Sequence, residues 1–184
     1  VRCFEDPNVI HVAGRVDPIA DIEVIQTELC LADLATVEKA LQRYTKAAKS
    51  GNDKEAAKLV SLLVPLQAAL NEGKPARTVP VSKEDAPLLK SLCLITAKPA
   101  MFVGNVAEDG FDNNPLLERL REYAAAQNAP VVAICAKIEA EMAEMSDEDR
   151  DMFLQEMGLE EPGLNRLIRA GFSLLGLQTY FTAG

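Results

Sequence analysis

The stretch Lys98-Pro-Ala-Met-Phe-Val-Gly-Asn-Val-Ala-Glu-Asp-Gly110 decides the fold that we expect for this chain. Its apolar residues 100–103 predict a short buried strand, and the polar residues after them predict a turn. In an α/β sheet, ligands bind at the carboxyl ends of the strands. The turn that begins at Asn105 is therefore the first candidate for a binding site, and a plain polar turn is the alternative.

A second apolar run, residues 130–135, begins at a proline and is rich in β-branched residues. It predicts a fully buried parallel strand. Between the two runs, Asn113-Asn114-Pro115 predicts the start of a helix with the proline in its first turn. The order strand, helix, strand, helix predicts an α/β fold with right-handed βαβ units.

Further helices are predicted after the second strand. Residues 138–145 form one helical run, Ser146 begins a capped acidic helix, and another helix starts at Pro162 or Gly163. Residues 177–184 predict a strand or a linker. At the other end, residues 1–4 predict the end of a strand, and residues 9–12 a short strand or an extended loop.

The first half of the chain carries two long helical patterns. Apolar residues recur at helical spacing over residues 22–49 and again over 54–72, separated by Ser50-Gly51-Asn52-Asp53. We expect Asp21 to cap the first helix, Gly51 to end it, and Pro65 to kink the second. Two helices joined by a tight turn predict an antiparallel hairpin that packs on itself like a short coiled coil.

The tip of this hairpin is locally basic. Residues 38–58 contain six cations against three acids, Glu38, Asp53 and Glu55. The six cations are Lys39, Arg43, Lys46, Lys49, Lys54 and Lys58. This pattern is typical of a solvated helical face, and it also fits an arm that contacts phosphates.

Composition limits the class of protein. The chain has 184 residues, of which 48% are apolar and 26% charged, which predicts a globular domain. No apolar run has the length of a membrane span. The net charge of −9 argues against a general nucleic-acid coat but allows a local basic surface.

The cysteines do not indicate a metal site. Cys3, Cys30, Cys93 and Cys135 lie far apart among apolar residues, which predicts reduced, buried thiols in a cytosolic protein. The single histidine, His11, alternates with apolar residues and is interpreted as structural. No pair of cysteines has the spacing of zinc ligands, so no metal ligands are predicted.

Three segments together resemble one family, the YchF subfamily of Obg-like ATPases within the translation-factor-related P-loop GTPases. Residues 21–29 resemble the helix that enters the family's coiled-coil arm. Asn105 to Asn114 resemble its altered base-specificity motif, and residues 158–182 resemble its passage into a C-terminal TGS domain. The resemblance covers essentially the whole chain.

The resemblance implies the C-terminal half of a P-loop NTPase (G) domain with parallel strands and an inserted antiparallel coiled-coil hairpin. Residues 1–31 and 82–184 would belong to the G domain, and 32–81 to the arm and linker. No Gly-x-x-x-x-Gly-Lys-Ser/Thr is present. The P-loop and the magnesium ligands are therefore expected outside this chain, which by itself is expected to be inactive and receives no catalytic residues.

The intact protein would be a monomeric cytoplasmic enzyme that binds ribosomes or ribosomal RNA and hydrolyses ATP, and GTP less well, with Mg²⁺. The base-contacting residues implied by the resemblance are Asn105, Val106, Glu108, Ala136 and Lys137. The tentative contacts with RNA or the ribosome are Lys46, Lys49, Lys54 and Lys58. A different class stays open, a non-enzymatic interaction module with a flavodoxin-like sheet and a coiled-coil arm that docks on RNA or protein.

The base motif departs from its common form, Asn-Lys-x-Asp. Guanine offers two donors to the usual aspartate, whereas adenine offers an acceptor at N1 and a donor at its amine. Glu108, one methylene longer, should spoil the fit to guanine, and the amide of Asn105 can both donate to and accept from adenine. Losing such a paired fit costs on the order of 2 kcal/mol, enough to alter base preference.

Overall fold

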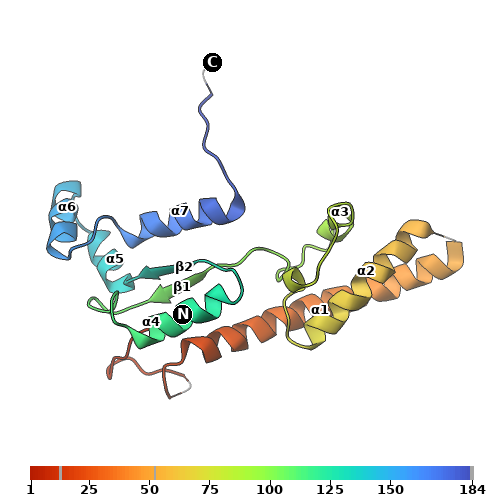
Figure 1. Cartoon of the computed structure of the whole chain (residues 1–184), viewed down its shortest axis with the longest axis horizontal. Helices are drawn as coiled ribbons and strands as arrows, with labels where there is room; N and C mark the ends of the chain where they lie inside the picture. Colours follow the sequence, from red (N-terminus) through yellow and green to blue (C-terminus); the bar gives the residue numbers. More distant parts are fainter. Residues whose placement is uncertain (13, 52, 183–184) are drawn as a thin grey trace. The chain divides into compact units, whose positions relative to one another are not determined.

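The chain folds into two compact units, each described here by itself. The computed structural model describes residues 1–12, 14–51 and 53–182. One unit comprises Val1–Ile22 with Ala100–Gly184, and the other Glu23–Pro99. Figure 1 shows their elements coloured along the chain. The predicted division at residues 31 and 82 assigns functions to these parts, and that assignment stays a prediction.

The first unit is built on a parallel pair of strands. β1, Phe102–Asn105, pairs with β2, Val131–Ile134, and Asn105 lies opposite Ile134. The parallel pairing and the α/β class are confirmed. The first strand begins two residues later than predicted and includes Asn105, because pairing with β2 and not the apolar run alone sets its ends.

The N-terminal residues extend this sheet on the other side of β1. Arg2 forms an isolated parallel bridge with Asn105. The N–H of Cys3 donates to the carbonyl of Asn105 at 2.7 Å, and the N–H of Asn105 donates to the carbonyl of Val1 at 2.8 Å. Residues 1–4 thus act as the strand end that was predicted, whereas residues 9–12 form a loop.

Helices cover both faces of the strands (Figure 1). α4, Pro115–Ala125, packs so closely on β1 that a Cβ at Gly104 would lie 3.0 Å from a methyl of Leu117. α7, Gly163–Leu175, packs on β2. Only Val132 of β2 is fully buried, so the prediction of a fully buried strand is wrong. In the described part of the chain β2 pairs on one side only, which leaves it partly open.

Two helices lie between β2 and α7. α5, Ala136–Met142, begins two residues earlier than predicted, and α6, Asp147–Glu156, begins after Ser146, whose hydroxyl accepts from the Asp149 N–H. α7 has a cap from another helix. The Glu139 carboxylate accepts from the N–H groups of Gly163, at 2.7 Å, and Leu164, at 3.2 Å.

The long helix α1, Pro18–Gly51, begins four residues before the predicted start. Asp17 and not Asp21 caps it, since its carboxylate accepts from the N–H groups of Ile19 and Ala20. The bond from Ala20 is the main reason that the pKa of Asp17 is lowered. A proline in the first turn has no N–H to leave unpaired, which favours this start. Gly51 is the last residue of α1, and Asn52 lies outside the described residues.

α2, Lys54–Asn71, completes the predicted antiparallel hairpin (Figure 1). Asp53 caps it by accepting from Glu55 and Ala56. The helix continues through Pro65 without a break in its assigned range. The two helices share one apolar cluster, whose buried members include Cys30, Val37, Ala40, Leu63, Leu66 and Leu70. Coiled-coil geometry stays a prediction.

A buried carboxylate ties the remaining segments of this unit to α1. Asp33 is 2% exposed and accepts from the N–H of Ile95 at 2.8 Å, the N–H of Thr96 at 2.7 Å and the Thr96 hydroxyl at 2.6 Å. The same hydroxyl accepts from the N–H of Ala76 at 2.9 Å. Ala76 begins the short helix η1, Ala76–Thr78, so one acid fixes two loops.

The last helix of this unit is α3, Ala86–Lys90. In the turn before it, the hydroxyl of Ser82 accepts from the Asp85 N–H at 3.1 Å. None of the helices among the described residues is both long and apolar enough to cross a bilayer.

Three of the four predicted buried thiols are buried. Burial raises the pKa of Cys3 and of Cys30, and Cys135 is also buried. Cys93 is exposed, at a positive φ of 49°, so the prediction is wrong there. It follows α3 in a turn, where an apolar flank in sequence does not ensure burial.

We predict that Asp33→Asn destabilises the hairpin unit by about 2–4 kcal/mol. In either orientation, the asparagine amide points its NH₂ group toward one of the backbone N–H groups that now donate to the carboxylate. Two donors then face each other, and one hydrogen bond is lost. Urea unfolding followed by circular dichroism measures the effect, with the exposed Glu38→Gln on the same helix as control. Unfolding of Asp33→Asn at the wild-type urea concentration would show that this buried carboxylate does not hold the two loops.

Candidate functional site

The two predicted binding turns meet at one edge of the sheet. Asn105 is the last residue of β1 and Ile134 the last residue of β2, and they are opposite each other in the parallel register. The residues that follow each strand therefore leave the sheet side by side. The Val106 N–H donates to the Ile134 carbonyl at 2.8 Å, which extends the pairing one step past the strands.

The side chain of Asn105 bridges the two turns. Its Oδ1 accepts from the N–H of Ala136 at 2.9 Å. Ala136 is the first residue of α5, and Cys135 in front of it supplies no side-chain cap. Asn105 thus takes the place of an N-cap from a neighbouring strand. This hydrogen bond fixes the orientation of its amide, and Nδ2 forms no hydrogen bond within the described residues.

The second bridge is an ion pair. The Lys137 ammonium lies 2.5 Å from Oε1 of Glu108, with 69% of the lysine side chain and 45% of the glutamate side chain exposed. The hydrogen bond to Glu108, and then the charge of that carboxylate, raise the pKa of Lys137. Exposed pairs of this kind are weak and open easily. The pair therefore marks where the two turns meet without locking them.

Val106 has a different role from the other predicted residues. Its side chain is 2% exposed and belongs to the apolar core of the first unit, together with Leu117 and Ile138. Its backbone N–H is already used by Ile134. In this conformation the side chain has no open face toward a ligand, so Val106 positions the turn.

Asn114 holds the far end of the first turn. Its Oδ1 accepts from the N–H groups of Leu116 and Leu117 and so caps α4. Its Nδ2 donates to the carbonyls of Cys3 and Gly110, both at 2.9 Å. The sequence identified Asn114 as a helix start but missed this anchoring role. The signal available was its place between the polar turn and Pro115.

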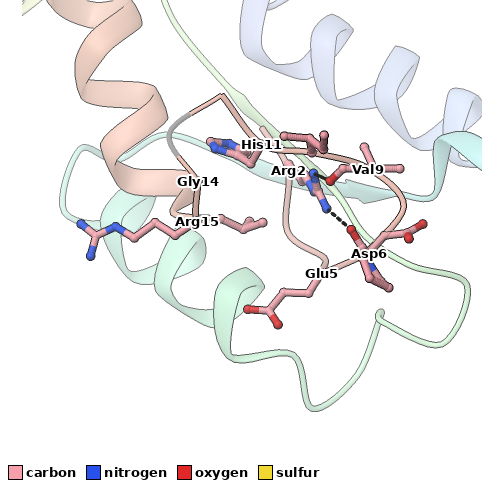
Figure 2. Close-up of a pocket in the computed structure, with 10 residues that line it drawn as sticks. Arg2, Glu5, Asp6, Val9, His11, Gly14 and Arg15 are labelled. Carbon is pink, nitrogen blue, oxygen red and sulfur yellow. Dashed lines mark hydrogen bonds between the residues drawn. The ribbon is translucent and has the colours of Figure 1, made fainter.

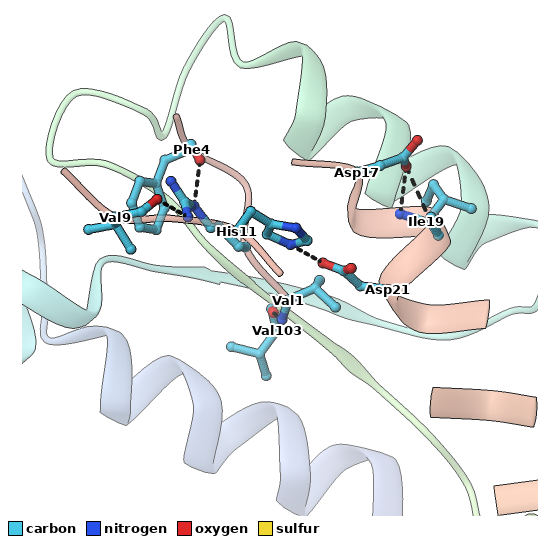
Figure 3. A network of polar contacts seen from close by, with 10 residues as sticks. Val1, Phe4, Val9, His11, Asp17, Ile19, Asp21 and Val103 are labelled. Atoms are coloured by element: carbon cyan, nitrogen blue, oxygen red, sulfur yellow. Dashed lines mark hydrogen bonds and ion pairs between the residues drawn. The ribbon is translucent and has the colours of Figure 1, made fainter. Parts of the chain in front are cut away.

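A second hollow lies in the N-terminal loop of the same unit. It has a volume of about 510 Å³, and its lining residues are drawn in Figure 2. They are Arg2, Glu5, Asp6, Pro7, Val9, Ile10, His11, Gly14, Arg15 and Val16. Arg2 donates within this loop to the carbonyls of Phe4 and Val9. His11 Nε2 lies 3.0 Å from the Asp21 carboxylate (Figure 3). These contacts tie the loop to α1.

No metal centre is assigned to these elements. Within residues 1–12, 14–51 and 53–182, no group of three or more His, Cys, Asp or Glu side chains is placed to hold a metal ion. The magnesium that accompanies a bound nucleotide needs oxygen ligands.

The four lysines predicted to contact RNA flank the α1–α2 turn. Lys46 and Lys49 lie near the end of α1, and Lys54 begins α2. In the described part of the chain these three form no ion pair. Lys58 lies 2.5 Å from Asp85, a contact that raises the pKa of Lys58 and lowers that of Asp85. The positive charge of Lys58 is therefore already balanced by the carboxylate of Asp85.

Comparisons with known proteins identify the relatives of this chain. The ribosome-binding ATPase YchF of Haemophilus influenzae is 53% identical over 184 residues, which are 100% of this chain and 50% of the relative. The protein of the same name from Bacillus subtilis is 50% identical over 187 residues, covering 100% of this chain and 51% of the relative.

A solved structure agrees with these relatives. The YchF GTPase of Schizosaccharomyces pombe superimposes with a TM-score of 0.84 at 27% identity, covering 100% of this chain and 51% of that one. No family model matches the chain. The chain spans about half the length of the curated relatives it matches. It is homologous to YchF proteins along its whole length, which confirms the resemblance and the fold class.

We predict that Asn114→Ala destabilises the chain by about 2–3 kcal/mol, because it removes the cap of α4 and both hydrogen bonds to the turn. Asn114→Asp separates the two roles, since aspartate caps equally well but cannot donate. In urea unfolding, we expect Asn114→Asp to be less stable than the unaltered chain but more stable than Asn114→Ala. Wild-type stability of Asn114→Asp would show that the anchoring bonds contribute nothing.

Proposed function

We propose, for a chain homologous to YchF proteins along its whole length, that it forms the purine-binding edge and the docking arm of a ribosome-associated P-loop NTPase. The intact protein would bind and hydrolyse ATP, and GTP less well, as a cytoplasmic monomer. One observation carries the proposal. The Oδ1 of Asn105 accepts a hydrogen bond from the N–H of Ala136, so the two turns implied to contact the base lie against each other.

The names of the relatives support a purine nucleoside triphosphate as the ligand, and they leave open whether its base is adenine or guanine. The bacterial relatives are named ribosome-binding ATPases, and the fission-yeast structure is titled a GTPase. A choice between adenine and guanine is made at the edge of the base, where their hydrogen-bonding groups differ. Asn105 and Glu108 are the residues in this chain that would make that choice.

The contacts of Asn105 suit adenine. Its Nδ2 forms no hydrogen bond within the described residues and is a donor for N7 of a purine. Its Oδ1 already accepts one hydrogen bond from Ala136, and a carbonyl oxygen has a second lone pair. That lone pair can accept from the 6-amino group of adenine. Guanine has a carbonyl oxygen at this position. It would face Oδ1 of Asn105 with no hydrogen between the two acceptors.

The ion pair of Glu108 adds to this preference. A free carboxylate would attract the N1–H and amine of guanine and repel the N1 lone pair of adenine. In this structure the carboxylate of Glu108 is bound by Lys137. In this conformation the pair lowers the negative charge that an adenine would meet, and Lys137 competes with a guanine for the carboxylate.

Hydrolysis itself is assigned to no residue here. The resemblance implies that the P-loop and the magnesium ligands would lie outside this chain, where they would hold the Mg²⁺ of the nucleotide. The part played by these residues is to bind and orient the base. Binding at the sheet edge would fix the nucleotide so that its phosphates reach the rest of the enzyme.

The helical hairpin is proposed to dock on ribosomal RNA. Lys46, Lys49 and Lys54 flank the turn between α1 and α2 and form no ion pair within the described residues, in a chain whose net charge is −9. Local positive charge on an acidic protein favours phosphate contacts at that site. Lys58 contributes less, because Asp85 balances it.

We predict that Glu108→Asp in the full-length protein shifts the ratio of ATP to GTP affinity toward GTP by about tenfold, since the shorter acid restores the guanine acceptor and reaches Lys137 less well. Isothermal titration calorimetry with both nucleotides measures the ratio. Asp109→Glu, the reverse change at the adjacent exposed acid, is the control.

Two results would contradict the base assignment. One is tighter binding of GTP than ATP by the unaltered protein. The other is an unchanged ratio in Glu108→Asp. If the full-length protein bound neither nucleotide, the non-enzymatic interaction module would replace the enzyme as the account of this fold.

We predict that combining Lys46→Glu, Lys49→Glu and Lys54→Glu weakens ribosome binding and flattens its dependence on salt, since each lost phosphate contact lowers the slope by about one. Co-sedimentation with ribosomes at several salt concentrations measures both. The matched control replaces the same three lysines with arginine, which keeps the charge. Equal binding by both triple variants would exclude docking through the tip.

A further inference from the structure

The hairpin unit contains a groove that neither the base site nor the basic tip accounts for. Its volume is about 1010 Å³, and every residue that lines it lies between Leu66 and Lys98. We call its apolar lining residues the floor. It includes Val79, Pro80, Val81, Pro87, Leu89 and Leu94. A hollow of this size and composition on one unit is large enough to take several side chains of a ligand.

We call the charged residues that line the groove its rim, and all of them are positive. Arg77, Lys83, Lys90 and Lys98 line it, and no acidic residue does. None of these four forms an ion pair with another described residue. The chain carries a net charge of −9, so four unbalanced cations around one hollow run against its overall charge. A ligand that fits must therefore bring negative charge to the rim and apolar groups to the floor.

The walls of the groove are held in place by buried polar contacts. Ala76 and Leu94 are 4% and 5% exposed, and both adjoin the cluster around Asp33. The Asp33 carboxylate accepts from Ile95 and Thr96, and the Thr96 hydroxyl accepts from Ala76. These bonds join two segments that form the groove. A preformed groove saves a ligand the cost of ordering it.

We propose that this groove binds an acidic peptide segment whose apolar side chains fill the floor while its Asp or Glu residues meet the four cations. Such pairing of apolar anchors with complementary rim charges is typical of peptide grooves. Single-stranded RNA fits less well, because it is gripped by stacking on aromatic rings and no aromatic residue lines this groove.

The groove also contains its own reporter. Cys93 lines it and is exposed, whereas Cys3, Cys30 and Cys135 are buried. A thiol reagent should therefore react first with Cys93. A peptide in the groove covers this thiol and slows the reaction, which locates binding without a second structure.

The test uses a fluorescein-labelled twelve-residue peptide, Glu-Leu-Leu-Glu repeated three times, and fluorescence anisotropy with the unaltered protein. We expect saturable binding that weakens at least tenfold in Lys83→Glu with Lys90→Glu. The matched control, Lys39→Glu with Arg43→Glu, makes the same charge change on exposed residues of the same unit outside the groove and should bind as the unaltered protein does. Circular dichroism checks that both variants are folded.

Two altered probes separate the parts of the recognition. Serine in place of every leucine should abolish binding if the floor takes apolar side chains, and unlabelled polyuridylate should not displace the peptide. No binding of the leucine peptide, equal binding of the serine peptide, equal loss in both charge-reversed variants, or displacement by polyuridylate would each overturn the proposal.

The reaction of Cys93 with Ellman's reagent gives an independent readout. Saturating peptide should slow this reaction at least fivefold, and Cys93→Ser should remove the fast phase, which assigns the signal. An unchanged rate with peptide bound would place the peptide elsewhere and overturn the groove as its site. A pyrene maleimide attached to Cys93 should in turn block the peptide.

Discussion

The parallel pairing of β1 with β2 is the constraint on which the rest of the first unit depends. Because Asn105 and Ile134 end their strands opposite each other, two turns distant in sequence leave the sheet at the same edge. The bond from Ala136 to Asn105 Oδ1 then joins these turns. A shift of one residue in this register would turn Asn105 to the other face of the sheet and separate it from α5.

Each unit uses one polar side chain to hold several backbone segments. Asn114 caps α4 and also binds two carbonyls, which fixes the turn that begins at Asn105. Asp33 gathers two loops against the hairpin in the same way. Such residues are expensive to bury and are kept only where their partners are complete. They leave the exposed side chains near them, such as Glu108, Lys137 and Cys93, available for contact with ligands.

Much of this fold was predictable from local patterns. Helical spacing located both arms of the hairpin, and Asn114-Pro115 located the start of α4. Some differences between prediction and structure depend on contacts distant in sequence, whereas the cap of α1 at Asp17 is a local one. Pairing with β2 moved β1 by two residues, and the Val106 side chain is buried in a core whose other members, such as Leu117 and Ile138, come from α4 and α5. Asp33 did leave a signal, an acid on the apolar stripe between Cys30 and Val37, but its partners lie 62 and 63 residues away.

The most direct test of a purine held at this sheet edge is a crystal structure of the full-length protein with a non-hydrolysable ATP analogue. The account predicts that the adenine lies between the turns after β1 and β2, with Nδ2 of Asn105 within hydrogen-bond distance of N7. It also predicts that the contact between Glu108 and Lys137 changes when the base enters. An adenine bound elsewhere, with Asn105 making only its present bond to Ala136, would contradict it.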